Sequence, residues 1–195
     1  MLKFNKRKVK TMDIFEVFDK RYSCRKYNGQ KVEREKLVKI VECARLAPSA
    51  CNTQPWHYVI VDDTDKVNAI SKATQKGMIG INKFTSDVPA FIVLVREKPN
   101  MTGRIASALS RDYSPNDIGI AIATMSYTAT ALGLGNCILG WFDEKKVSDA
   151  LNLPKSSYPD LILAVGYADG EKKSPVKKDM EKICSINQYG IYEKE

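Results

Sequence analysis

Two short segments of the chain hold residue types that could bind a ligand. The first, RYSCRKY at residues 21–27, places Arg21 and Arg25 four positions apart with Ser23 between them. In a helix or a tight loop, this spacing would let two guanidinium groups and one hydroxyl converge on one anion. The planar fork of arginine suits phosphate oxygens or the carbonyl-rich edge of a ring. A solvated basic loop is the alternative, and the spacing alone does not exclude it.

The second segment, APSACNTQPW at residues 47–56, has two prolines on either side of small and amide side chains. A residue that precedes proline is driven towards extended geometry, which leaves backbone groups and the side chains of Ser49 and Asn52 free to face a ligand. Ala50 is small enough for a flat ring to lie close to it. The alternative is a plain connection between a helix and a strand, and we expect Trp56 to pack in the core in either case.

Together, the two segments resemble the start of the flavin-dependent nitroreductase family. The family signature is R-x-S-x-R/K with an aromatic residue two positions later, followed by a helix that ends in A-P-S-x-x-N-x-Q-P-W. The likeness continues at residues 117–143, with a long apolar helix, G-L-G, a short strand and an aromatic-Asp turn, and again at residues 158–183. It therefore covers nearly the whole chain from Met12.

The resemblance implies that FMN is bound non-covalently in two equal pockets of an intertwined homodimer. Arg21 and Ser23 would hold the phosphate and ribityl end, with the backbone of Tyr22. Arg25 would reach the N1–O2 edge of the isoalloxazine, where a fixed cation stabilises the negative charge of the reduced ring. The other implied contacts are Pro48, Ser49, Ala50 and Asn52 from the second subunit, the backbone of Leu139 and Gly140 at flavin N5, Asn82 at the pyrimidine edge, and Lys177 at the phosphate.

The implied chemistry is hydride transfer from NADH or NADPH to flavin N5, followed by reduction of a second substrate in a ping-pong cycle. Nitroaromatics, quinones and similar conjugated compounds are the implied electron acceptors, and no catalytic side chain is required. Relatives of the same fold that remove halogens or cleave flavin remain alternatives, as does a flavin binder without turnover.

These residues need a scaffold, and the hydrophobic pattern predicts an α+β fold with a central, mostly antiparallel sheet flanked by helices. We expect a single domain over residues 12–195, with Ser114 as the N-cap of its longest helix. The predicted helices cover residues 13–19, 33–46, 64 onwards, 114–132 and 143–151, and the predicted strands cover residues 57–61, 90–95, 136–139 and 160–166.

The net charge of +8 requires a nucleic-acid-binding module to be considered. Five of the cations lie in residues 1–11, and removing them leaves only +3, so we expect no nucleic-acid partner. We interpret residues 1–11 as a disordered basic extension, or as translated sequence upstream of a start at Met12.

The five cysteines include no CxxC pair, and there is one histidine, which favours reduced thiols in the cytoplasm and no metal site. The most apolar run, residues 118–135, is too short and too polar to span a bilayer. We therefore expect no membrane partner.

Overall fold

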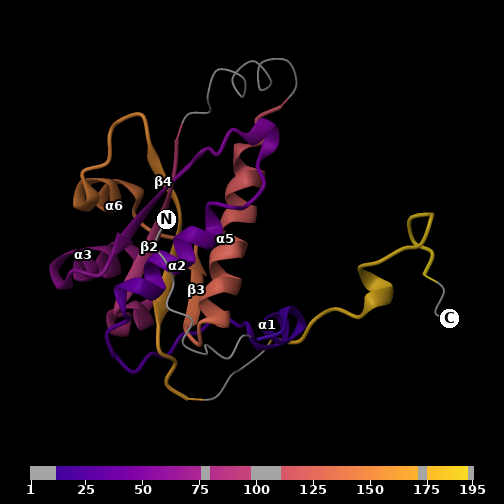
Figure 1. The fold of residues 1–195 in the computed structure, drawn as a ribbon, viewed down its shortest axis with the longest axis horizontal. Coiled ribbons are helices and arrows are strands. Elements are labelled where there is room, and N and C mark those ends of the chain that lie inside the picture. The colour runs from indigo at the N-terminus through magenta and orange to yellow at the C-terminus, as the bar shows by residue number, and fades with distance from the viewer. Residues whose placement is uncertain (1–11, 76–79, 98–110, 171–174, 193–195) are drawn as a thin grey trace.

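A four-stranded antiparallel sheet forms the centre of the fold (Figure 1), in the order β1-β2-β4-β3. The computed structural model describes residues 12–75, 80–97, 111–170 and 175–192. Helices cover both faces of the central strand β2, so its run AFIVLV is buried throughout and is continuously apolar rather than alternating. The strands are β1 (Trp56–Val61), β2 (Ala90–Arg96), β3 (Gly135–Leu139) and β4 (Tyr158–Gly166).

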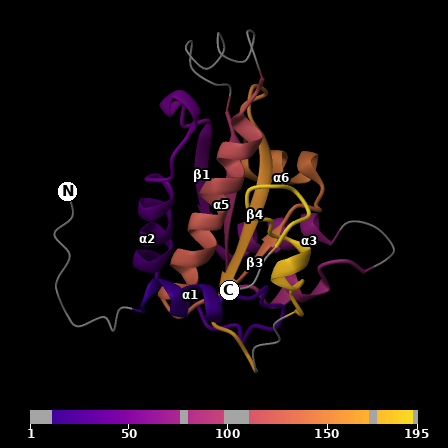
Figure 2. The same cartoon turned by 90° about the vertical axis from the view of Figure 1, so that its right-hand side faces the viewer.

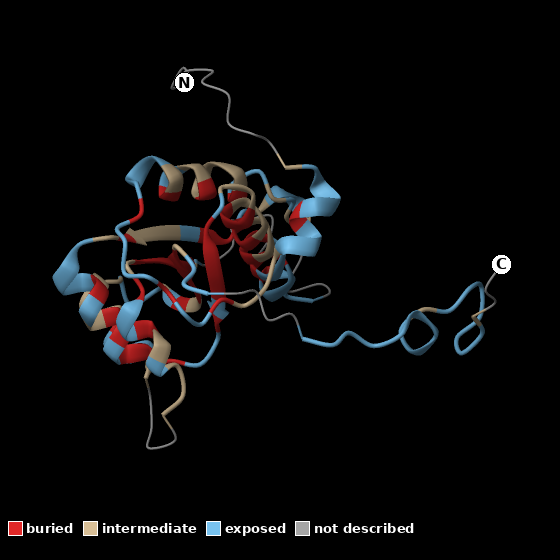
Figure 3. Ribbon diagram, turned by 90° about the horizontal axis from the view of Figure 1, so that it is seen from below, coloured by how far each residue is buried: buried red, intermediate tan, exposed pale blue. Residues whose placement is uncertain are grey.

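Alternate residues of the sheet enter two separate hydrophobic clusters. Ile92 and Leu94 point into the cluster that packs against α2 and α5, whereas Phe91 and Val93 point into the cluster that packs against α3 and α6. Figure 3 shows the buried residues gathered on the strands and on the inner sides of these helices. The helices are α2 (Arg34–Ala44), α3 (Thr64–Thr74), α5 (Ser114–Ala131) and α6 (Glu144–Leu151).

A short N-terminal helix, α1 (Ile14–Lys20), packs against α5. The side chain of Asp13 caps it by accepting a hydrogen bond from the backbone N–H of Phe15 at 2.8 Å. The ring of Phe18 meets Tyr127 of α5 edge to face, with 4.8 Å between ring centroids. Three short 3-10 turns complete the described elements: η1 (Ala50–Asn52), η2 (Lys83–Asp87) and η3 (Met180–Lys182).

The predicted fold class and the predicted helices and strands are confirmed, with differences of at most two residues at their ends. The capping of α5 was predicted wrongly. Tyr113 is its N-cap and Ser114 is already helical, because the carboxylate of Asp112 accepts a hydrogen bond from the backbone N–H of Ser114 at 2.9 Å. Trp56 is 8% exposed, as expected of a core residue.

Residues 175–192 form a tail that leaves the body of the fold (Figure 1). Two apolar or aromatic side chains in it, Val176 and Tyr189, are each 99% exposed. In the part of the chain that the structure describes, no helix is both long enough and apolar enough to cross a membrane. The predicted extension, residues 1–11, lies outside the described residues.

Candidate functional site

The first candidate segment, which we call the basic strap (residues 21–27), is extended rather than helical. Ser23 forms an isolated parallel bridge with Asn136 of β3, and Tyr27 forms an antiparallel bridge with Ala168, just beyond β4. The strap is thus anchored at both places to the edge of the sheet. Convergence of its polar side chains must therefore come from the two-residue repeat of an extended chain and not from a helical turn.

The buried side of the strap packs tightly against β3. Cys24 is 1% exposed, and its backbone N–H donates to the carbonyl of Asn136 at 2.9 Å. The hydroxyl of Tyr27 donates to the carbonyl of Cys24 at 3.0 Å. A Cβ at Gly135 would lie 2.8 Å from the sulfur of Cys24, so only glycine allows the strap to approach the strand this closely.

The other side of the strap carries Arg21, Ser23 and Arg25. Burial raises the pKa of the Cys137 thiol, and the positive charges of Arg25 and Arg21 both act on that pKa in the opposite sense. Both guanidinium groups therefore lie close enough to the Cys137 thiol on β3 for their charges to act on it. Among the described residues, no carboxylate forms an ion pair with either arginine.

Lys26, on the same strap, differs from the two arginines because it has an acidic partner. Its ammonium group forms an ion pair with Asp169 at 2.8 Å. This pair closes one side of a hollow of about 450 Å³, whose remaining lining comes mainly from the strap. Tyr22 also lines the hollow, and burial raises the pKa of its hydroxyl to about 12. Within the part of the chain that the structure describes, the strap therefore has two arginines without an acid partner, beside a lysine that has one.

The end of β3 lies on the same edge of the sheet. Because the bridge between Ser23 and Asn136 is parallel, the strap and β3 run in the same direction, towards the end of the strand at Leu139. We call residues 139–142 the strand-end turn. Gly140 is exposed there, and a Cβ on it would meet only Leu161, at an ordinary distance of 3.5 Å. Nothing within the described chain therefore requires glycine at this position.

Asn82 reaches the strand-end turn from η2. Its amide nitrogen donates to the carbonyl of Trp141 at 3.1 Å and to the carbonyl of Thr74 at 3.2 Å. The structure therefore brings together Asn82 and the segment containing Leu139 and Gly140, which lie far apart in the sequence.

The second candidate segment, which we call the proline loop (residues 47–55), is more than a connection. Cys51, Asn52 and Gln54 all have positive φ angles, between 46° and 51°, a conformation that is uncommon outside glycine. The hydroxyl of Ser49 accepts a hydrogen bond from the backbone N–H of Gln54 at 3.0 Å, which helps to hold this shape. Pro48 and Asn52 are exposed.

A buried carboxylate joins the proline loop to α5. Asp117, in the first turn of α5, is 4% exposed and accepts a hydrogen bond from the backbone N–H of Ala50 at 3.1 Å. The sequence reasoning missed Asp117 as part of the site. Its position directly after Ser-Pro-Asn, at the start of the longest predicted helix, was the available signal.

The two candidate segments lie at opposite ends of α5 (Figure 2). The proline loop contacts Asp117 in the first turn of α5, whereas the strap contacts Asn136, which follows the last turn. A helix of 18 residues is about 27 Å long. One chain therefore does not bring the proline loop and the basic strap to the same place.

Lys177 is also separate from the strap within one chain. It lies in the exposed tail, and no hydrogen bond or ion pair among the described residues joins it to residues 21–27.

Comparison with known proteins places the chain in a family. The family model described as "Nitroreductase family" matches residues 19–83 and 80–167. The chain belongs to the nitroreductase family. A solved structure of an FMN-dependent nitroreductase from Clostridium difficile R20291 has a TM-score of 0.73 and 28% sequence identity, and the match covers 90% of this chain and 99% of that one.

Two curated relatives show that the family contains different activities. An oxygen-insensitive NADPH nitroreductase from Helicobacter pylori is 26% identical, over 84% of this chain and 92% of the relative. An iodotyrosine deiodinase from Thermotoga neapolitana is 25% identical, over 82% of this chain and 90% of the relative. This nitroreductase-family chain is therefore similar to both to nearly the same degree.

Asn136 is a second residue that the sequence reasoning missed in this nitroreductase-family site. Its side-chain oxygen accepts from the hydroxyl of Ser126 at 2.6 Å, and its amide nitrogen donates to the carbonyl of Ser126 and the hydroxyl of Thr130, each at 3.1 Å. Because its backbone carbonyl also holds Cys24, this buried asparagine fixes the strap relative to α5. No pattern in the sequence marks it, since the contacts join segments through the fold.

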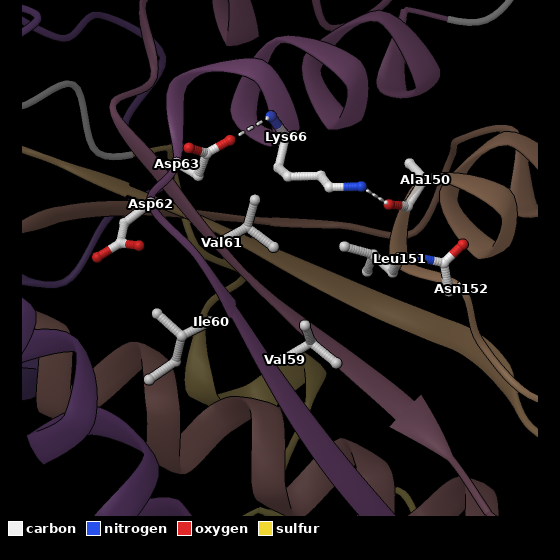
Figure 4. Close-up of a pocket in the computed structure, with 9 residues that line it drawn as sticks. All are labelled: Val59, Ile60, Val61, Asp62, Asp63, Lys66, Ala150, Leu151 and Asn152. Atoms are coloured by element: carbon white, nitrogen blue, oxygen red, sulfur yellow. Dashed lines mark hydrogen bonds between the residues drawn. The ribbon is translucent and has the colours of Figure 1, made fainter.

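A separate hollow of about 220 Å³ lies between the end of β1, the start of α3 and the end of α6 (Figure 4). Lys66 crosses it and donates from its ammonium group to the carbonyl of Ala150 at 2.6 Å. None of the predicted nitroreductase-site residues lines this hollow. Among the described residues there is also no group of histidine, cysteine and acidic side chains that could hold a metal ion.

Proposed function

We propose that the chain is an FMN-dependent NAD(P)H oxidoreductase that reduces nitroaromatics, quinones or similar conjugated acceptors. The observation that carries this proposal is the basic strap. It holds two arginines that form no ion pair with any described acid, with a serine between them, against the edge of the sheet. The family membership and the nitroreductases among its relatives support it.

The chemistry of the donors fits FMN. Arg21 and Ser23 would bind the phosphate and ribityl end together with the backbone of Tyr22, since guanidinium groups and hydroxyls form charge-assisted hydrogen bonds to phosphate. Arg25 would face the N1–O2 edge and stabilise the negative charge that the ring gains on reduction. The exposed glycine at position 140 is explained if a ligand approaches the backbone there, with an N–H of residues 139–140 donating to flavin N5.

When bound, FMN would supply hydride transfer between the nicotinamide and the acceptor. The chain would then need no nucleophile or general base of its own. Its residues would bind and orient the ring and compensate its charge.

The proposed site needs a second copy of the chain. A two-fold axis across α5 would reverse that helix, and the proline loop of one copy would then meet the basic strap of the other. The outer face of α5 suits such packing because it carries no charge. Asp117 is the only charged residue of this helix, and it is buried. Gly119, Ile120, Ala123 and Thr124 lie on that outer face, and Tyr127, further along it, is in contact with Phe18 of α1.

Further exposed apolar groups support an intertwined homodimer. Phe15 of α1 is 76% exposed, and the tail carries Val176 and Tyr189 out into solvent. Exposed apolar surface of this kind marks protein interfaces. In the homodimer that we propose, the tail would reach the partner, Lys177 would approach the phosphate, and Pro48, Ser49, Ala50 and Asn52 would line the ring from the second subunit.

Reductive removal of halogen is a second candidate activity. The deiodinase relative is 25% identical and the nitroreductase relative is 26% identical, so identity does not separate the two. For either activity we propose a cytoplasmic location, because all five cysteines are free, as is usual in a reducing compartment.

The visible absorption spectrum of the purified protein tests the proposal. We expect flavin bands that bleach anaerobically on addition of NADH or NADPH and return when a nitroaromatic or a quinone is added. Return of the bands with an iodotyrosine, and not with these acceptors, would favour the second activity. Protein that stays colourless after incubation with excess FMN would contradict the proposed function.

A further inference from the structure

Two separate anchors hold the basic strap, and the first of them lies beside α5. The backbone N–H of Cys24 donates to the carbonyl of Asn136 at 2.9 Å, within the bridge between the strap and β3. The strap begins where α1 ends, since the backbone N–H of Arg21 donates to the carbonyl of Val17 at 2.9 Å. Because α1 packs against α5, both supports of residues 21–24 refer to that helix.

The second anchor holds the other half of the strap to the segment that follows β4. Tyr27 forms its bridge with Ala168, and the backbone N–H of Asp169 donates to the carbonyl of Lys26 at 3.0 Å. The ammonium group of Lys26 also pairs with the carboxylate of Asp169 at 2.8 Å. The two halves of the strap therefore have different supports.

The side chain of Asn136 joins the first anchor to α5. Its oxygen accepts from the hydroxyl of Ser126, and its amide nitrogen donates to the carbonyl of Ser126 and to the hydroxyl of Thr130. The Thr130 hydroxyl donates in turn to the carbonyl of Ser126 at 3.0 Å. An amide group has two N–H donors, and both have partners here. Asn136 is also 1% exposed, so its side chain does not act by touching a ligand.

We propose that Asn136 is a positioning residue, which acts on the phosphate end of FMN through the strap. The inference rests on the proposed function, in which Arg21 and Ser23 bind the phosphate and ribityl end and Arg25 faces the ring. The half of the strap that Asn136 anchors carries Arg21 and Ser23, whereas Arg25 stands next to the second anchor.

This division of the strap predicts a selective effect. Groups that bind a ligand are most effective when they are held in place before the ligand arrives. A weaker first anchor should therefore reduce binding at the phosphate end and leave the ring end largely unchanged.

The test compares the affinity of the dimeric protein for FMN and for riboflavin, which lacks the phosphate. Thr130→Val keeps the shape of the side chain but removes the hydroxyl that accepts from Asn136, so a buried N–H loses its partner. We expect FMN binding to weaken by about three- to ten-fold and riboflavin binding to change by less than about two-fold. Thr130→Ser keeps the hydroxyl and should bind both flavins as the wild type does. Ser126→Ala removes the other hydroxyl that contacts Asn136 and should repeat the pattern of Thr130→Val.

The matched control is Thr128→Val. The hydroxyl of Thr128 donates to the carbonyl of Thr124, four residues earlier, at 2.8 Å, which is the same kind of bond that Thr130 makes. The amide of Asn136 bonds to residues 126 and 130 and not to Thr128. We expect Thr128→Val to bind both flavins as the wild type does.

A second measurement places Thr130→Val in an Arg21→Ala background. If a misplaced Arg21 causes the loss, Thr130→Val should weaken FMN binding there by no more than about two-fold. Equal losses for FMN and riboflavin, a full loss that persists in the Arg21→Ala background, or no loss in either Thr130→Val or Ser126→Ala would overturn the inference. Wild-type protein that binds neither flavin would overturn the proposed function itself.

Discussion

At the scale of single residues, neighbouring cations on one strap differ in their partners. Lys26 pairs with Asp169, whereas Arg21 and Arg25 form no ion pair with an acid among the described residues. Side chains of alternate residues point to opposite sides of an extended chain, so the sequence RYSCRK separates a paired cation from two available ones. This difference supplies both a prediction and its control.

We expect Arg25→Ala to weaken FMN binding by about ten- to a hundred-fold, the effect of losing a charge-assisted contact. Reduction of the bound flavin by NADPH should also slow, because the cation that stabilises the reduced ring is absent. Flavin titration and anaerobic stopped-flow absorbance measure the two effects. Lys26→Ala removes an equal charge from the adjacent position and should change neither by more than a small factor. Unchanged affinity and rate in Arg25→Ala would refute the role that we assign to this residue.

A second residue-scale prediction concerns pH. Hydrogen bonds from Arg34 to both carboxylate oxygens, at 2.5 and 2.7 Å, lower the pKa of Asp62, although its partial burial acts in the opposite direction. Since the pKa of Asp62 is lower in the folded state than in the unfolded state, ionised Asp62 stabilises the fold above its unfolded pKa of about 3.9. That contribution disappears as the pH falls through the folded pKa.

We therefore expect Asp62→Asn to unfold at a lower temperature than the wild type at pH 7. The difference should begin to shrink as the pH falls below about 3.9 and should vanish as the pH falls through the lower folded pKa of Asp62. Thermal unfolding followed by circular dichroism from pH 7 downwards would measure this. Asp65→Asn, at an exposed position on α3, is the control. A difference between Asp62→Asn and the wild type that is the same at every pH would contradict the assignment.

At the scale of elements, the first turn of α5 holds the proline loop in its strained shape. Asp117 is a buried acceptor for the backbone N–H of Ala50, and it lies at the helix end where negative charge is stabilising. The loop in turn presents Pro48 and Asn52 outwards. Asp117 therefore does not line the proposed pocket itself, but it holds the proline loop that would line it.

We expect Asp117→Ala to weaken FMN binding several-fold and to lower the unfolding temperature, because it leaves a backbone N–H without its partner. Asp117→Asn keeps an oxygen that can accept from Ala50 and should have a smaller effect on both. Flavin titration and thermal unfolding of the two variants side by side provide the comparison. Equal losses in the two variants would show that the charge of Asp117, and not its contact with Ala50, is what matters.

At the scale of the whole molecule, the proposed pocket is complete only in a dimer. The proline loop and the basic strap lie at opposite ends of α5, and the outer face of that helix carries no charged residue. Self-association through this face would account for both observations.

Ala123→Glu would place a charge in the middle of this face. We expect it to shift the protein from dimer to monomer in sedimentation velocity and to release FMN in parallel, since each proposed pocket uses both chains. Asn68→Glu introduces the same charge on the exposed side of α3 and should leave the dimer intact. A monomer that remains fully loaded with FMN would contradict the two-chain pocket.

The sequence alone was enough to determine the elements and the candidate segments of this protein. Apolar periodicity located the helices and strands, because a helix and a strand repeat their core-facing residues with different periods. Arginine spacing and proline placement identified residues 21–27 and 47–56, since the chemistry of those residues is local.

Only the tertiary structure decided which residues meet and which do not. It showed that the strap is extended, that Asn82 contacts the strand-end turn, and that Asp117 and Asn136 hold the two segments at opposite ends of α5. Several of these contacts join residues that are tens of positions apart in the sequence. Whether such residues meet in space depends on strand order and helix packing, which no local pattern encodes.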